Sequence, residues 1–338
     1  MEYILNDVLE IKNGKNQKAV ENSEGQYPIY GSGGVIGYAD DYICDADTVV
    51  IGRKGSINNP IYVSEPFWNV DTAFGLVARR EVLLPRYLFY FCKKFDFEKL
   101  NKTVTIPSLT KSDLLNIKIK LPDIDEQQLV VDKLIRIESV MEFRKQELNV
   151  LDNLIKARFV ELFDGKYPED TLLNLCNIVD YRGKTPEKVE HGLPFITAKN
   201  VKMHHMTLEP REYISKETYD KVMVRGFPKE GDVVFTTEAP LGNVCRIPHF
   251  DTEFYIGQRI VTMQTDALNP TYLEYALSDE EFVRKYMGKS SGSTVTGIRV
   301  RLLQQLTIPV PARTLQDEFS TFVNQVDKSK VTVQKAFE

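Results

Sequence analysis

The chain has 338 residues, of which 42% are hydrophobic and 27% charged, and its formal net charge is −5 at pH 7. This length allows two domains of ordinary size, and the composition excludes a membrane protein, because no apolar run approaches the roughly 20 residues that span a bilayer. The N-terminus lacks the basic and then apolar order of a signal peptide, and the four scattered cysteines show neither CxxC spacing nor a disulfide framework. We therefore expect a reduced, cytoplasmic setting.

Residues 1–122 are predicted to form a first, mixed α+β domain. Short apolar runs broken by Gly, Asn and Pro predict strands at 48–51, 61–63, 74–77 and 117–121. A helix is predicted to start at Pro85, with Tyr87, Leu88 and Phe91 on one face.

Residues 123–165 are predicted to form a long spacer helix, which Asp164 and Gly165 end. Apolar residues seven apart form one series: Leu134, Met141, Leu148, Ile155 and Leu162. A second series, which Arg144 and Arg158 interrupt, consists of Val130, Ile137 and Leu151. This heptad repeat predicts a coiled-coil seam along a rod of roughly 60 Å.

Residues 166–309 are predicted to form a second α+β domain, followed by a shorter helix over residues 310–338. In that helix Phe319, Val326 and Val333 lie seven apart. The two helices are expected to pack together, because neither apolar stripe can stay exposed to water.

The second domain repeats the first. Six pairs of segments match in the same order: Val8–Ile11 with Leu175–Ile178, Tyr27–Ile29 with Leu193–Phe195, Val49–Ile51 with Val233–Phe235, Pro85–Tyr90 with Pro270–Tyr275, Leu114 and Ile117 with Leu303 and Leu306, and Leu121-Pro122 plus Gln127 with Val310-Pro311 plus Gln316. The framework therefore predicts two copies of one domain, each followed by a helix. The loops differ, since residues 31–34 and 52–56 are unlike residues 197–200 and 236–240, which suits two related binding functions on two targets.

This order of parts resembles the specificity subunit of type I restriction–modification systems. The segments that fit this family are residues 49–56, 121–128 and 257–261. The resemblance covers essentially the whole chain and implies a non-catalytic, sequence-specific DNA-recognition subunit without a cofactor. It further implies two tandem target-recognition domains, each reading one half of a split target in double-stranded DNA. The helices would pack as an antiparallel coiled coil that sets the spacing and docks two modification (methyltransferase) subunits, which in turn recruit motor-nuclease subunits.

Candidate DNA contacts lie in the predicted loops. Arg53 and Lys54 are flanked by Gly52 and Gly55, which would let the backbone approach a ligand, and arginine is the commonest guanine reader. The full predicted set is Arg53, Lys54, Ser56, Lys102, Thr103, Arg182, Lys184, Thr197, Lys199, Asn200, Thr237, Arg259, Ser291 and Thr294. The alternative for these residues is a set of solvated turns.

The central helix carries a predicted docking surface for partners. In an antiparallel pair the short second helix would leave its first turns uncovered, so a partner subunit or a second copy of the chain is expected there. The predicted docking residues are Leu129, Val130, Leu134, Ile137, Met141 and Leu148.

Two other functions stay open. Residues 59–62 (Asn-Pro-Ile-Tyr) are close to the Asn-Pro-Pro-Tyr loop with which amino-methyltransferases hold a flipped adenine, so the chain could be a DNA adenine methyltransferase with its own active site. The acidic net charge is the argument for a scaffold that binds only protein. The four histidines show no metal-ligand spacing, and His204 and His205 are expected to be an exposed pair.

Overall fold

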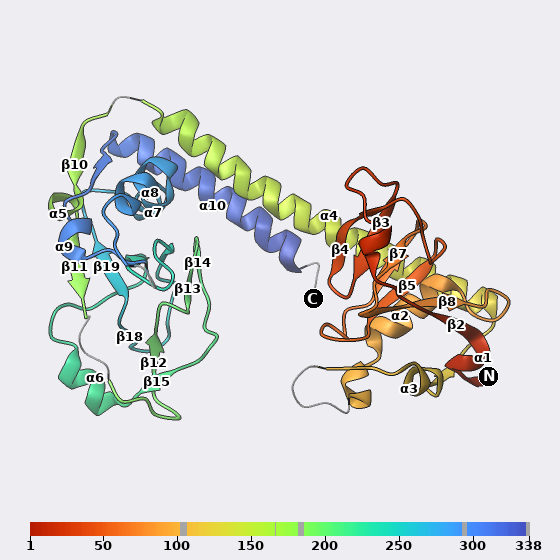
Figure 1. Ribbon diagram of the computed structural model, residues 1–338. Coiled ribbons are helices and arrows are strands. Elements are labelled where there is room, and N and C mark those ends of the chain that lie inside the picture. Colours follow the sequence, from red (N-terminus) through yellow and green to blue (C-terminus); the bar gives the residue numbers. More distant parts are fainter. Residues whose placement is uncertain (102–106, 166, 182–185, 293–295, 336–338) are drawn as a thin grey trace. The chain divides into compact units, whose positions relative to one another are not determined.

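The computed structural model describes residues 1–101, 107–165, 167–181, 186–292 and 296–335 (Figure 1). The chain divides into two compact units, Met1–Phe143 and Arg144–Glu338. A single continuous helix, α4 (Ile124–Phe163), contributes to both units.

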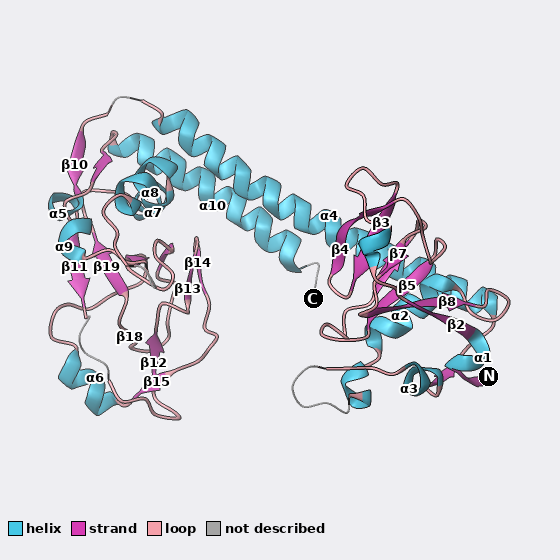
Figure 2. Ribbon diagram, viewed as in Figure 1, coloured by secondary structure: helices cyan, strands magenta, loops and turns pink. Residues whose placement is uncertain are grey.

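The first unit is built on two small sheets (Figure 2). One is antiparallel with the order β2-β8-β5-β6, formed by Leu9–Asn13, Ala73–Ala78, Thr48–Gly52 and Ile61–Val63. The other has the order β4-β3-β7, formed by Gly34–Ala39, Tyr27–Gly31 and Trp68–Asn69, with β3 and β7 parallel. The short pair β1 (Glu2–Ile4) and β9 (Lys118–Lys120) closes the unit, and its helices are α1 (Leu5–Val8), α2 (Pro85–Lys94) and α3 (Lys111–Leu115).

The second unit repeats this topology strand for strand. The order β11-β19-β16-β17 uses Asn177–Asp180, Ile260–Gln264, Val233–Thr236 and Val244–Arg246. The order β15-β12-β18 uses Tyr213–Ile214, Leu193–Ile196 and Tyr255–Ile256, again with one parallel pair. The closing pair is β10 (Glu169–Thr171) and β20 (Thr307–Pro309). The α+β fold in two tandem copies, predicted from the matched segments, is confirmed.

The registers agree as well as the strand order. Val49 pairs with Leu76 on β8, and its counterpart Val233 pairs with Met263 on β19. Every residue of β5 and β16 is buried, because each strand is central in its sheet and has packing on both faces. The strands predicted in the first domain are all present, and α2 begins at Pro85 as predicted, with proline at the first helical position.

The second unit adds elements around this framework. Its helices α5 (Leu172–Leu175), α7 (Pro270–Ser278) and α9 (Val300–Leu303) are the counterparts of α1, α2 and α3, and the added helices are α6 (Lys216–Val222) and α8 (Glu280–Met287). A small hairpin, β13 (Val201–Lys202) and β14 (His205–Met206), follows the strand β12.

Helix α4 packs antiparallel against the last helix, α10 (Arg313–Lys335), as predicted (Figure 1). Arg158 is paired with Glu318 at 2.6 Å, while Asp152, nearer the start of α4, is paired with Lys330 at 2.7 Å. The rings of Phe159 and Phe319 meet with centroids 5.4 Å apart.

The heptad series describes this seam only in part. Ile155 is fully buried, but Ile137 and Met141 are 54% and 52% exposed. Phe159 and Phe163, which lie outside the predicted series, are buried instead. The seam therefore combines the heptad residues Leu151, Ile155 and Leu162 with an aromatic cluster at the end of α4, because α10 pairs with the second half of that helix.

Within the described residues no helix is long and apolar enough to cross a membrane. All four cysteines are buried as free thiols. Burial raises the pKa of the Cys44, Cys176 and Cys245 thiols to about 12, so these groups stay protonated and unreactive in the folded chain.

Candidate nucleic-acid interface

In the first unit, loops from four parts of the sequence meet at the end of β5. The Arg53 amide donates to the Thr72 carbonyl at 2.8 Å, and the Leu109 amide donates to the Arg53 carbonyl at 2.9 Å. Gly52 brings the turn after β3 into the same place, since a Cβ at Gly52 would lie 3.0 Å from the Cβ of Ser32. Gly52 is therefore required by this close approach.

The second unit joins three of these loops with equivalent bonds. The Thr237 amide donates to the Arg259 carbonyl at 2.8 Å, and the Ile298 amide donates to the Thr237 carbonyl at 2.9 Å. These matching bonds show which residues of the two units are equivalent. Arg53 corresponds to Thr237, Thr72 to Arg259 and Leu109 to Ile298. The bridge between Lys54 and Ser108 likewise corresponds to the bridge between Glu238 and Gly297.

The predicted residues of the first cluster are accessible. Arg53, Lys54 and Ser56 are all exposed. The Arg53 guanidinium lies 5.8 Å from the centre of the Phe74 ring, and one of its terminal nitrogens is 3.5 Å from the Asp71 carbonyl. Among the described residues neither Arg53 nor Lys54 has a carboxylate partner, so both charges are free to meet an anion.

The predicted residues of the second cluster divide into exposed and buried ones. Lys199, Arg259 and Ser291 are exposed, and Thr197 is half-buried. The Ser291 backbone pairs with Gly297 in the same loop.

Asn200 and Thr237 do not lie on the surface as expected, being 1% and 2% exposed. The Asn200 side chain accepts from the Thr197 amide and hydroxyl and donates to the carbonyls of Thr207 and Pro210. Its bonding capacity is then full, so Asn200 holds the loop in shape and has no atom left for a base. A short polar residue at the start of a loop can either stabilise the loop or contact a ligand, and the sequence does not distinguish these two roles.

Five predicted contacts, Lys102, Thr103, Arg182, Lys184 and Thr294, lie outside the described residues. Two residues of the clusters were missed: Thr72 and Glu238. Both could have been found by carrying the repeat alignment through the loops, because they stand opposite Arg259 and Lys54.

The two clusters differ in charge. Lys54 in the first corresponds to Glu238 in the second, where a carboxylate oxygen of Glu238 forms an ion pair with Nε of Arg259 at 3.1 Å. Equivalent backbones thus present different patterns of donors and acceptors. Such surfaces can distinguish different ligands on one scaffold.

His204 is not the exposed residue that the sequence suggested. Its ring stacks on Tyr275 with centroids 4.3 Å apart, and Nδ1 lies 3.0 Å from the buried Glu274 carboxylate. Arg246 donates to the other oxygen of Glu274 at 2.6 Å, so the β13–β14 hairpin is tied to α7 by a buried ionic group. His205 is exposed. No group of three metal-ligating side chains occurs in the part of the chain that the structure describes.

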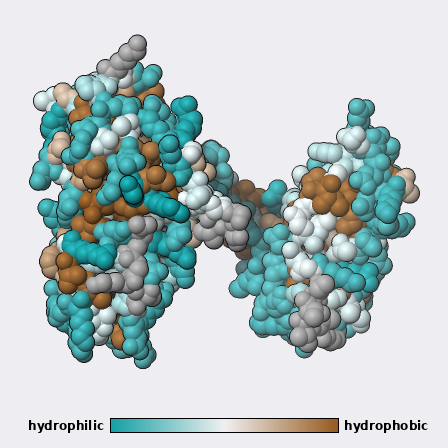
Figure 3. All heavy atoms as spheres, turned by 60° about the vertical axis from the view of Figure 1, so that its left-hand side comes forward, coloured by the Kyte–Doolittle hydropathy of each residue, from teal (hydrophilic) through white to brown (hydrophobic). Residues whose placement is uncertain are grey.

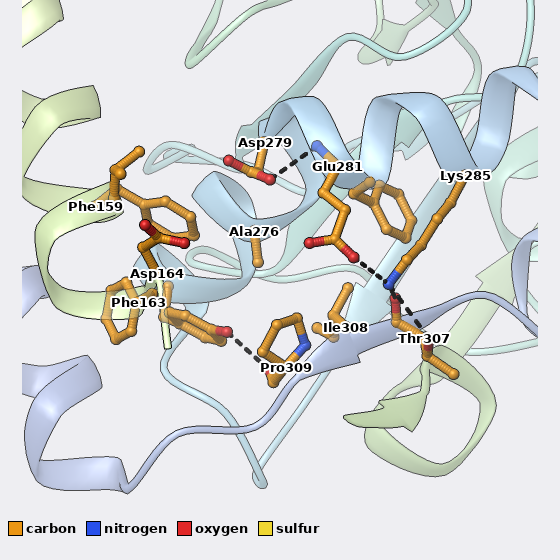
Figure 4. Close-up of a pocket in the computed structure, with 13 residues that line it drawn as sticks. Phe159, Phe163, Asp164, Ala276, Asp279, Glu281, Lys285, Thr307, Ile308 and Pro309 are labelled. Carbon is orange, nitrogen blue, oxygen red and sulfur yellow. Dashed lines mark hydrogen bonds and ion pairs between the residues drawn. The ribbon is translucent and has the colours of Figure 1, made fainter. Parts of the chain in front are cut away.

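A separate pocket of the second unit lies beside the aromatic seam, away from the loops (Figure 4). Phe159 and Phe163 of α4 line it together with Pro309, and Lys285 crosses its edge to contact Glu281 and Thr307. These contacts hold the end of α4 against the second unit, so the pocket belongs to the helix junction.

Most of the surface in view is hydrophilic, and hydrophobic residues gather in patches on both units and along the helical segment (Figure 3). On the first half of α4, Leu129, Val130, Ile137 and Met141 are 60%, 36%, 54% and 52% exposed. Of the other predicted docking residues, Leu134 is half-buried, and half-buried Leu148 lines the groove beside α10.

Comparison with known proteins agrees with this architecture. The family described as "Type I restriction modification DNA specificity domain" matches residues 1–153. The type I restriction enzyme MjaVIII specificity subunit of Methanocaldococcus jannaschii is 24% identical, over 86% of this chain and 74% of that protein. The putative specificity subunit S.HindORF215P of Haemophilus influenzae is 23% identical, over 95% of this chain and 88% of that protein.

Two solved structures share the fold. The S subunit of a type I restriction–modification system from M. genitalium aligns over 99% of this chain and 91% of its own, with a TM-score of 0.63 and 16% identity. A chain from a type I R-M system described for its complex assembly and conformational transition aligns over 99% of this chain and 92% of its own, with a TM-score of 0.56 and 18% identity. The repeated framework, the paired loop clusters and these similarities agree: residues 1–153 match the DNA specificity domain, and the whole chain is similar to specificity subunits of type I restriction–modification systems.

Proposed function

We propose that this chain is the sequence-specific DNA-recognition subunit of a type I restriction–modification complex, in which each unit reads one half of a bipartite target. The observation that carries the proposal is the loop cluster, in which three loops are joined by equivalent backbone bonds in both units while their side chains differ. Arg53 and Lys54 in one cluster and Lys199 and Arg259 in the other supply the cations that phosphates and guanine edges require.

The chain leaves methyl transfer to its partners. In a methyltransferase active site the aromatic ring of the Asn-Pro-x-Tyr loop must be free to stack on a flipped base. Here the Tyr62 ring lies under the Arg86 guanidinium at 4.3 Å, and its hydroxyl donates to Asp47 at 2.5 Å. Asn59 and Pro60 accordingly form the turn that leads into β6, which contains Tyr62, and nothing favours the methyltransferase alternative. A radiolabelled methyl-transfer assay on the chain alone should show no incorporation.

The helices serve as the assembly surface. The exposed apolar side chains on the first half of α4 would be costly to leave in water, and a modification subunit is the proposed occupant. Because the two units are pseudo-equivalent, we expect two modification subunits per chain, which in turn recruit the motor-nuclease subunits. The helices would set the spacing between the two half-targets. The proposed location of the complex is the cytoplasm.

Methylation mapping tests the proposal. Genomic DNA from cells with and without the chain, in the presence of its modification subunits, should differ by one bipartite methylated motif. The complex should bind a duplex carrying that motif, with affinity that falls as salt rises. An identical methylation pattern in both cells would contradict DNA recognition, and salt-independent or absent DNA binding would favour the protein-only scaffold.

A further inference from the structure

Arg259 and Glu238 form the charged pair of the second loop cluster. Their side chains are 51% and 43% exposed, and the Nε–Oε1 distance is 3.1 Å. Exposed ion pairs contribute little to folding stability, so stability does not account for the pair. A carboxylate facing DNA repels phosphates, and it is favourable there only where it meets a hydrogen-bond donor.

The backbone holds both residues in place before any ligand arrives. The residue before Glu238, Thr237, donates its amide to the Arg259 carbonyl at 2.8 Å, and Glu238 itself bridges to Gly297. A Cβ at Gly297 would lie only 3.1 Å from the Cβ of Glu238, so glycine gives the glutamate room. Arg259 has a φ of 68°, a left-handed conformation that is costly for a non-glycine residue and is concentrated at functional sites.

The pair leaves particular atoms available. Only Nε of Arg259 is engaged by Glu238, and the two terminal guanidinium nitrogens have no partner among the described residues. The second carboxylate oxygen of Glu238 is likewise without a partner in that part of the chain. The pair therefore presents two donors beside an acceptor.

This pattern matches one base-pair edge in the major groove. A G·C pair presents N7 and O6 of guanine as acceptors, followed by the N4 amino group of cytosine as donor. Resting on the proposed function, we propose that Arg259 and Glu238 together read one G·C pair in the half-target of the second unit. Arg259 donates to guanine N7 and O6, and Glu238 accepts from cytosine N4.

The first unit lacks this reader. The positions of Glu238 and Arg259 are occupied there by Lys54 and Thr72, so the first unit has no carboxylate–guanidinium pair at this place. The pair is thus a difference in specificity between two otherwise equivalent loop clusters.

The first test uses the complex with its modification subunits in cells. Glu238→Ala and Arg259→Ala should each relax the methylated motif at one G·C position of the second half-target, by roughly 5- to 150-fold in preference. The double variant should relax that same position with less than the sum of the two effects, because the residues act as one unit. Glu217→Ala, which alters the exposed pair with Lys221 on α6, is the matched control and should keep the motif unchanged.

The second test locates the atoms. Duplexes carrying the motif are made with 7-deazaguanine or N4-methylcytosine at that position, modifications that keep the base pair but remove guanine N7 or the groove-facing N4 proton. Wild type should lose affinity for both duplexes, Arg259→Ala should be insensitive to the first, and Glu238→Ala, which has no acceptor at this position, should be insensitive to the second. An unchanged motif in both variants, or a uniform loss of methylation without a change at one position, would overturn the pair as a reader. If the wild-type complex produces no motif at all, the proposed function fails instead.

Discussion

Gln127 and Gln316 make the same buried contact in the two units, at 0% and 1% exposure. Oε1 of Gln127 accepts from the Leu84 amide at 2.9 Å while Nε2 donates to the Pro122 carbonyl at 3.0 Å. Oε1 of Gln316 accepts from the Asn269 amide at 2.8 Å while Nε2 donates to the Pro311 carbonyl at 2.8 Å. Each glutamine therefore joins the start of a long helix to the N-terminus of the short helix packed beside it, which explains the repeated Pro-x-x-x-x-Gln spacing.

Removing either amide should destabilise its own unit. Gln127→Ala leaves the Leu84 amide and the Pro122 carbonyl unpaired in a buried place, so we expect a loss of about 2–3 kcal/mol. The single tryptophan, Trp68, is buried in the first unit and reports on its unfolding in urea. Gln127→Ala should shift that fluorescence transition to lower urea. Gln316→Ala and the exposed neighbour Gln128→Ala should leave it in place, and a shift with Gln128→Ala of equal size would contradict the account.

The two cations of the first loop cluster should differ in their roles. If Arg53 contacts a base edge, Arg53→Ala should weaken binding by about 1–3 kcal/mol and relax preference at one position. Lys54→Ala should weaken binding evenly across sequences and lower the salt slope by about 1. Titrations of target and single-base variants at two salt concentrations separate these outcomes. Equal losses on every sequence would make Arg53 a phosphate contact, and no loss would leave it as a solvated turn.

Exchanging one recognition domain should change one half of the target. The framework repeats while the loops differ, so replacing residues 1–122 with another recognition domain should alter only the half read by the first unit. Methylation mapping of cells carrying the chimera provides the measurement. A change in both halves would contradict the model of two independent readers.

The exposed face of α4 should matter for assembly and little for folding. Leu129→Glu and Ile137→Glu replace side chains that are 60% and 54% exposed, so the stability of the free chain should change by less than about 0.5 kcal/mol. Binding to the modification subunit should be lost, because the charge would be buried in the interface. Light scattering with and without that subunit measures both association and any self-association of the chain. Leu173→Glu, at a 58% exposed position on α5, is the control that should bind normally.

The closing strand pair of the second unit should be sensitive to acid. A hydrogen bond from the Thr307 hydroxyl, followed by contacts with Lys285, holds the pKa of Glu169 below its ordinary value of 4.5. A lowered carboxylate pKa contributes stability that is present above that ordinary value and is lost as the pH falls through the lowered one. Stability measured from about pH 5 to about pH 3 should therefore fall less steeply in Glu169→Gln than in wild type. Glu190→Gln, at a 92% exposed side chain, should follow the wild-type curve.

The local pattern of the sequence determined much of this protein. The order of matched segments was enough to predict two copies of an α+β domain, and the absence of Pro and Gly from residue 124 to 163 was enough to predict the long helix. The same features carried the family resemblance. Strand and helix propensity, and the spacing of apolar residues, depend on neighbours in the chain, so they can be recognised without a fold.

Only the tertiary structure decided which loop residues face outward and which residues meet. Asn200 and Thr237 looked like surface contacts but are buried, and Glu238 gained a role only once its loop was placed beside Arg259. The heptad positions Ile137 and Met141 stay exposed, while Phe159 and Phe163 join the later heptad positions in the seam, because the partner helix covers only part of α4. Burial and convergence depend on pairings between segments tens to hundreds of residues apart, and these arise only when the sheets and helices pack together.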